Sequence, residues 1–214
     1  IINAEKIKNV SIYSLDKNCG PGVARNLAIK KSFGKYLIFL DADDRLNLKA
    51  FSIVLKKIKK NNKEDIFFLG YQKKKNPQID LSKNKFDKKI LLKKYLRTEL
   101  DMNPNFYLFK KNFILNNKIF FKSGFYEDIP FVLKCFFYSK KLNFFPEEIY
   151  IKNNYRNSIT NSFTEKHIFS FVNSSKEKFK FFNLNMRSKL PLSFVDDLQY
   201  GLRGDYCFVK KIIT

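Results

Sequence analysis

The amino-acid sequence predicts an α/β fold in which a sheet is flanked by helices and followed by a C-terminal helical segment. Apolar runs of strand length alternate with helical patterns through the first third of the chain. One nearly continuous apolar run, 35–40, stops abruptly at a cluster of carboxylates, which puts polar side chains at the end of a buried strand. The 214 residues are 44% hydrophobic and include 25 Phe, enough for one large core.

The early elements follow from local patterns. Residues 10–15 predict a short strand, and a Gly- and Pro-containing loop then leads into a helix over 23–32. Residues 35–40 predict a strand buried on both faces. Apolar residues at helical spacing predict a helix over 51–58, and the run 66–69 before a glycine predicts another strand.

The later elements are predicted in the same way. The Lys- and Asn-rich stretch 72–89 predicts a solvated connection. After it we expect, in order, a helix at 88–100, a strand at 106–109, a short helix at 113–115, a helix at 129–137 and two short strands within 142–151. From residue 163 onward the apolar spacing is helical.

The composition is strongly basic, with 42 Lys and Arg against 20 Asp and Glu and a formal net charge of +22. Such a charge favours polyanionic partners, so a non-enzymatic protein that binds nucleic acid or an anionic membrane is one open alternative. Most of the basic residues are Lys, and no zinc-finger, basic-zipper or RNA-binding signature occurs. Three widely spaced Cys favour a reducing compartment, and no apolar run is long enough to span a membrane.

The carboxylate cluster contains Asp41, Asp43 and Asp44. Adjacent carboxylates repel one another, so the pattern favours a divalent cation unless hydrogen bonds compensate the charge. A solvated turn in which Asp44 or Asn47 caps the next helix is the alternative. An EF-hand loop is excluded because Leu46 and Ser52 occupy its required Gly and Glu positions, whereas a nucleophilic Asp of a phosphoryl-transfer site stays open.

Two blocks of sequence resemble the central signature of family 2 glycosyltransferases, which have the GT-A fold. They are N-C-G-P-G-V-A-R-N at 18–26 and G-K-Y-L-I-F-L-D-A-D-D at 34–44. The Glu127–Asp128 pair and the stretch 155–160 resemble later family motifs in the same order. The resemblance implies a partial GT-A domain over 1–162, with a mixed, Rossmann-like sheet flanked by helices, that begins at about the third strand. It also implies a helical extension over 163–214.

The resemblance also implies roles for individual residues. Asp43 would bind the divalent cation, Mn²⁺ or Mg²⁺, that bridges the donor diphosphate, and Asp128 would be the general base that activates the acceptor hydroxyl, with Glu127 assisting in acceptor binding. The residues expected to lie near the nucleotide sugar are Asn18, Arg25, Asp41, Asp43, Asp44, Arg156 and Ser158. Simpler roles stay open: Asn18 shaping a turn, Arg25 at a helix surface and Asp128 capping a helix. The single histidine, His167, is expected at the surface.

The predicted function is metal-dependent, inverting transfer of a sugar, a hexose or a related one, from a nucleotide-diphosphate donor to a glycan or lipid-linked acceptor. The resemblance suggests bacterial surface polysaccharide or lipopolysaccharide synthesis. It implies a cytoplasmic location with peripheral contact at the inner face of the membrane as an option, and no specific nucleic-acid partner. An inactive transferase fragment is the other open alternative, since the chain begins partway through the domain that it resembles.

Overall fold

The structure is a computed structural model, and it describes residues 9–60, 63–71, 88–97, 99–153, 164–185 and 195–203. The five strands are β1 (Tyr36–Ile38), β2 (Arg45–Leu46), β3 (Ile66–Tyr71), β4 (Tyr107–Lys110) and β5 (Leu142–Ile151). The labelled helices are α1 (Pro21–Lys31), α2 (Leu48–Lys60), α3 (Lys88–Leu96), α4 (Lys111–Asn116), α5 (Asp128–Tyr138) and α6 (Glu165–Asn185). Residues 195–203 form a further helical segment, and Pro104–Phe106 form a 3-10 turn.

The strands form one mixed sheet in the order β1-β4-β3-β5-β2. Strands β3 and β5 pair in parallel, with Ile66 opposite Leu142, and the other neighbouring strands are antiparallel. The predicted α/β class, with a mixed sheet flanked by helices, is therefore confirmed.

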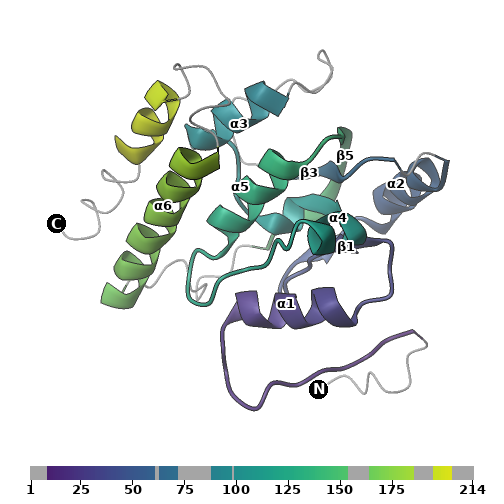
Figure 1. Ribbon diagram of the computed structural model, residues 1–214. Coiled ribbons are helices and arrows are strands. Elements are labelled where there is room, and N and C mark those ends of the chain that lie inside the picture. Colours follow the sequence, from purple (N-terminus) through teal and green to yellow (C-terminus); the bar gives the residue numbers. More distant parts are fainter. Residues whose placement is uncertain are drawn as a thin grey trace.

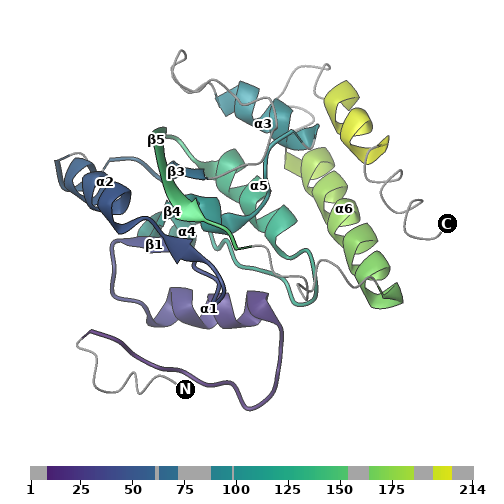
Figure 2. The same ribbon diagram turned by 180° about the vertical axis from the view of Figure 1, so that it is seen from behind.

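Helices cover both faces of the sheet (Figures 1 and 2). Helix α2 packs on one face, where its Val54 and Ile58 share a core cluster with Phe67 and Leu69 of β3. The opposite face belongs to a larger core that includes residues of α1, α3, α4, α5 and α6. Phe182 of α6 and Leu198 of the last helical segment belong to this same core. None of the helices that the structure describes is long and apolar enough to cross a membrane.

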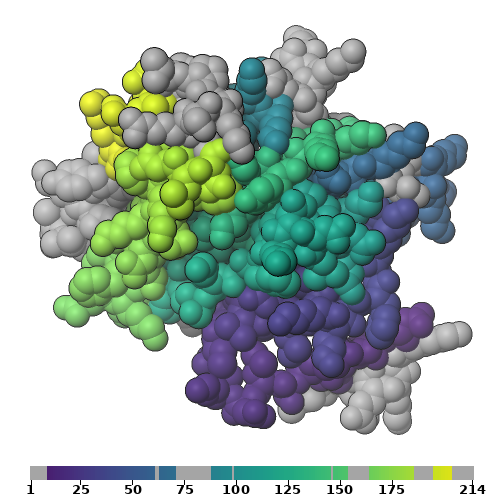
Figure 3. All heavy atoms as spheres, in the orientation of Figure 1, coloured from purple at the N-terminus to yellow at the C-terminus, as the bar shows by residue number. Residues whose placement is uncertain are grey.

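Two predicted elements differ from the structure. The segment 10–15 is not a strand: Ile12 is 63% exposed, and no strand among the described residues lies beside it to satisfy its backbone. It runs past α1 at one end of the molecule, as the space-filling view shows (Figure 3). The two short strands expected within 142–151 are one strand, β5, whose pairing with β3 shifts register between Leu69 and Gly70. Such a bulge accommodates Pro146, which has no N–H to donate.

The strand predicted at 35–40 is also less enclosed than expected. β1 lies at an edge of the sheet among the described residues, and only Leu37 of its three residues is fully buried. The predicted connection at 72–89 falls largely outside the described residues, except for the start of α3.

Candidate active site

Arg25 of α1 joins the two acidic groups that the sequence singles out. Its Nη1 donates a hydrogen bond of 2.7 Å to Glu127 Oε1, and its Nη2 donates one of 3.0 Å to Asp41 Oδ1. The guanidinium carbon lies 5.5 Å from the centre of the Phe121 ring, and the side chain is only 16% exposed. Arg25 is therefore not a surface helix residue. It holds the end of the sheet and the start of α5 at one site, although they are far apart in sequence.

Helix α1 is fitted closely against the segment that carries Glu127. A Cβ atom on Gly22 would lie 2.5 Å from the Lys122 carbonyl oxygen and 2.8 Å from Glu127 Cγ, so only glycine fits this contact. Asn26 makes two hydrogen bonds of 2.9 Å to the backbone N–H and C=O of Phe121. Sequence reasoning did not assign these two residues a role. The available signal was spacing: Gly22, Arg25 and Asn26 stand at i, i+3 and i+4, and residues with this spacing share one helix face.

Asp44 is held entirely by protein groups. Its Oδ1 accepts the backbone N–H of Asn153 at 2.9 Å, and its Oδ2 accepts the hydroxyl of Tyr150, which in turn accepts Asn105 Nδ2 at 2.8 Å. Asp44 is 9% exposed and Asn105 is fully buried. These contacts favour a supporting role for Asp44 over direct contact with a cation or the nucleotide sugar. Asp44 is not a helix cap either, because Asn47 Oδ1 accepts the N–H of Ala50 at the start of α2.

Asp43 is the carboxylate that remains available to a ligand. Its side chain is exposed, and within the described part of the chain no hydrogen bond or ion pair reaches its carboxylate. Its backbone carbonyl accepts the side-chain amide of Asn153, which anchors the turn. No group of three potential metal-binding side chains occurs among the described residues. Asp43 alone therefore fits Mg²⁺ or Mn²⁺ only if substrate phosphates and water supply the remaining ligands of the cation.

The Asp128 carboxyl has strongly perturbed electrostatics. Burial raises its pKa to about 7, and the adjacent Glu127 carboxylate adds to the rise. Burial also raises the pKa of Glu127, although the Arg25 guanidinium opposes this effect. Helix α5 begins at Asp128 itself, whose Oδ1 accepts the N–H of the next residue, Ile129, at 3.0 Å. A helix cap would instead accept an N–H two or three residues further on, so capping does not account for Asp128.

The remaining predicted residues are not part of this group. Asn18 Oδ1 accepts the N–H of Gly20 at 3.0 Å, which closes a turn before α1, and Asn18 lines a cavity of about 620 Å³ between residues 11–20 and α1. Arg156 and Ser158 lie outside the described residues. The expectation for His167 was wrong: it is 8% exposed, because its ring stacks on Phe125 with centroids 4.0 Å apart.

The architecture is that of GT-A glycosyltransferases. The structure is similar to S. aureus TarS residues 1–349, solved in complex with UDP-GlcNAc, with a TM-score of 0.65 and 16% identity. This match covers 94% of the present chain and 66% of the TarS chain. A second TarS structure, in complex with UDP, gives a TM-score of 0.58.

The sequence profile of glycosyl transferase family 2 matches residues 2–127, and the chain belongs to this family. An uncharacterized glycosyltransferase of Rickettsia bellii is 50% identical over 50 residues, which are 23% of this chain and 7% of that protein. A cholesterol galactosyltransferase of Borreliella burgdorferi is 24% identical over 182 residues, covering 77% of this chain and 50% of that protein. The chain thus spans half or less of the length of these two relatives. Family membership supports a glycosyltransferase over the basic non-enzymatic alternative.

Proposed function

We propose that the protein transfers a sugar from a nucleotide-diphosphate donor to an acceptor hydroxyl with inversion at the anomeric carbon. The observation that carries the proposal is that Arg25 joins Asp41, two residues before exposed Asp43, to Glu127, which directly precedes Asp128. TarS binds UDP-GlcNAc and UDP, which supports a nucleotide-sugar donor.

In the proposed reaction Asp128 accepts the proton of the acceptor hydroxyl. The freed oxygen forms a bond to the anomeric carbon as the bond from that carbon to the diphosphate oxygen breaks, and the diphosphate leaves with the electron pair. A carboxyl whose pKa is about 7 is well matched to this task, because it is partly ionised at neutral pH and basic enough to take the proton. Glu127, fixed by Arg25, orients the acceptor.

Asp43 would hold a divalent cation, Mn²⁺ or Mg²⁺, and a bound cation would stabilise the negative charge of the leaving diphosphate. Arg25 and Asp41 shape the donor side of the site through their 3.0 Å ion pair. We assign Asn18, Arg156 and Ser158 to the surroundings of the nucleotide and diphosphate. Asp44 supports the turn that carries Asp43 by accepting the backbone N–H of Asn153.

The acceptor class we propose is a bacterial surface glycan, such as a polysaccharide or lipopolysaccharide, or a lipid-linked precursor. The Borreliella relative is named for transfer to cholesterol, a hydroxyl of a lipid, and the net charge of +22 suits work beside an anionic membrane. Peripheral attachment to the inner face of the bacterial membrane, in the cytoplasm, is part of this proposal.

A donor screen tests the proposal. The full-length protein is incubated with UDP-, GDP- and dTDP-sugars and Mn²⁺ or Mg²⁺, and release of the nucleoside diphosphate and thermal shift are measured. Asp43→Asn is expected to lose the metal-dependent response. Asp128→Asn is expected to keep donor binding and lose transfer, and Asp16→Asn, at an exposed loop carboxylate, serves as the matched control. Transfer by Asp128→Asn at nearly the wild-type rate would refute the assignment of the base.

A further inference from the structure

The residue that precedes the carboxylate pair has an unusual backbone. Tyr126 has a φ of 57°, in the left-handed region that a bulky side chain rarely adopts. Such a conformation is strained and persists only where surrounding contacts hold it. Because Tyr126 is bonded directly to Glu127, its backbone angles set the direction in which Glu127 and Asp128 leave the turn.

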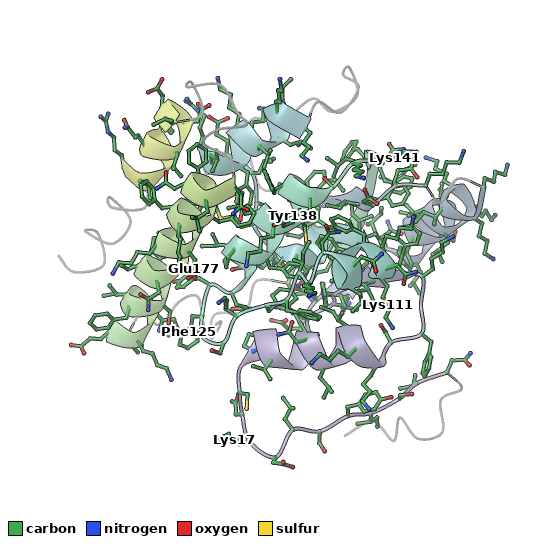
Figure 4. All side chains as sticks on the ribbon, viewed as in Figure 1. Lys17, Lys111, Phe125, Tyr138, Lys141 and Glu177 are labelled. Carbon is green, nitrogen blue, oxygen red and sulfur yellow. The ribbon has the colours of Figure 1, made fainter. Side chains whose placement is uncertain are left out.

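Helix α6 supplies the contacts that hold this turn. Ser174 Oγ donates a hydrogen bond of 2.8 Å to the Tyr126 carbonyl oxygen. The Phe171 ring packs edge-on against the Tyr126 ring, with centroids 5.0 Å apart and an interplanar angle of 77°. One turn earlier on α6, the His167 ring stacks on Phe125 at 4.0 Å. Figure 4 labels Phe125 beside α6.

These three residues of α6 form one face of the helix. Their positions, 167, 171 and 174, follow the i, i+4, i+7 spacing of a single stripe. His167 is fixed in turn by the start of its own helix, where its Nδ1 accepts the backbone N–H of Thr164 at 3.2 Å. The stripe therefore packs against residues 125 and 126 and holds them in place.

We propose that α6 is a positioning element for the carboxylate pair, in which Phe171 and Ser174 are positioning residues that hold Tyr126 and thereby aim Asp128 at the acceptor. The inference rests on the proposed function, because it assigns a purpose to the placement of the proposed base. The turn is then held from two sides: α1 holds Phe121 and Glu127 through Asn26 and Arg25, and α6 holds residues 125 and 126.

Loss of the α6 contacts changes the surroundings of Asp128 in a defined direction. Within the described residues, the ionisable groups that face Asp128 are Glu127, Arg25, Tyr95 and Tyr126. Relaxation of Tyr126 lets water reach the Asp128 carboxyl, which lowers its pKa from about 7 toward the ordinary value of 3.8. It also moves the base away from its productive position, and a displacement near 1 Å costs on the order of 100-fold in rate.

The test compares Phe171→Ala and Ser174→Ala with Phe169→Ala in the full-length protein. Phe169 lies on the same helix with its side chain 68% exposed, so it is the matched control. Sugar transfer is measured as kcat and donor KM across pH. In both test variants we expect a kcat at least ~10-fold lower, an unchanged donor KM, and a rising limb of the pH–rate profile shifted to lower pH. Ser174→Thr, which keeps the hydroxyl, is expected to retain most of the wild-type kcat.

The outcomes separate this inference from the proposed function. The positioning role would be overturned if Phe171→Ala and Ser174→Ala had the same kcat and pH profile as Phe169→Ala while Asp128→Asn was inactive. That result would leave the proposed function intact. If Phe171→Ala does not fold, the Ser174→Ala and Ser174→Thr pair decides. If the wild type transfers no sugar, the proposed function fails, and hydrogen exchange over 122–129 decides: faster exchange in Ser174→Ala than in Phe169→Ala supports the grip of α6, and equal exchange refutes it.

Discussion

Replacement of Asp128 by Asn is expected to stabilise the folded protein at neutral and alkaline pH. The substitution preserves the size of the side chain and the Oδ1 atom that accepts the Ile129 N–H at 3.0 Å. It removes a negative charge that burial and the Glu127 carboxylate both disfavour. A proposed catalytic group would thus reduce the stability of the fold that contains it.

The size of the effect follows from the pKa of Asp128, which burial raises from 3.8 to about 7 in the folded protein. Above pH 7 the carboxyl is ionised in both the folded and the unfolded state, and the full difference of roughly 4 kcal/mol opposes folding. Below about pH 4 it is protonated in both states, and this difference vanishes. Between these limits the folded state binds the proton more tightly, so the free energy of unfolding of the wild type falls as pH rises.

Urea denaturation at pH values from about 4 to about 8 measures the effect. The free energies of unfolding of wild type and Asp128→Asn are expected to agree at the acidic end and to diverge through neutral pH, with the variant more stable. Asp16→Asn, which alters an exposed loop carboxylate, is expected to stay within about 0.5 kcal/mol of wild type throughout. Parallel curves for wild type and Asp128→Asn would show that Asp128 does not carry the buried charge, and the reasoning would fail.

Three further substitutions test the packing of the site. Gly22→Ala drives a methyl group into Lys122 and Glu127, so thermal melts should show a loss of about 1–3 kcal/mol together with loss of transfer; an active, equally stable variant would contradict the close fit. Asn26→Ala removes both bonds to the Phe121 backbone and is expected to cost about 2 kcal/mol in urea unfolding, whereas a neutral effect would show that water replaces the amide. Tyr150→Phe deprives the buried Asp44 of a donor, with an expected cost of about 1–3 kcal/mol, and a change within error would argue against the Asp44 network.

The order of helices and strands could be predicted because it depends on local patterns. The helix predicted from apolar spacing at 51–58 is α2, and the strand predicted from the apolar run 66–69 is β3, each with small shifts at its ends. The prediction failed at 10–15, where the β-forming sequence is present but no partner strand is described beside it. A strand depends on its neighbour for hydrogen bonds, and a local pattern carries no information about that neighbour.

The sequence predicted the carboxylates of the candidate site but not the contacts that join or hold them. Asp41, Asp43, Asp44, Glu127 and Asp128 were found because acidic residues after a buried strand and before a helix stand out in a Lys-rich chain. Which of them is free and which is held depends on distant partners, such as Arg25 and Glu127, 102 residues apart, and Asp44 and Asn153, 109 residues apart. Long-range contacts of this kind cannot be obtained from spacing along one sequence.

The sequence by itself determined the α/β class, most of the helix–strand order and the acidic residues proposed for the candidate site. Only the tertiary structure decided that Arg25 joins these groups, that Tyr150 and Asn153 hold Asp44, and that α6 grips the turn before Glu127. The physical reason is burial. The electrostatic properties of Asp128 and the left-handed backbone of Tyr126 depend on which surfaces the folded chain brings around them.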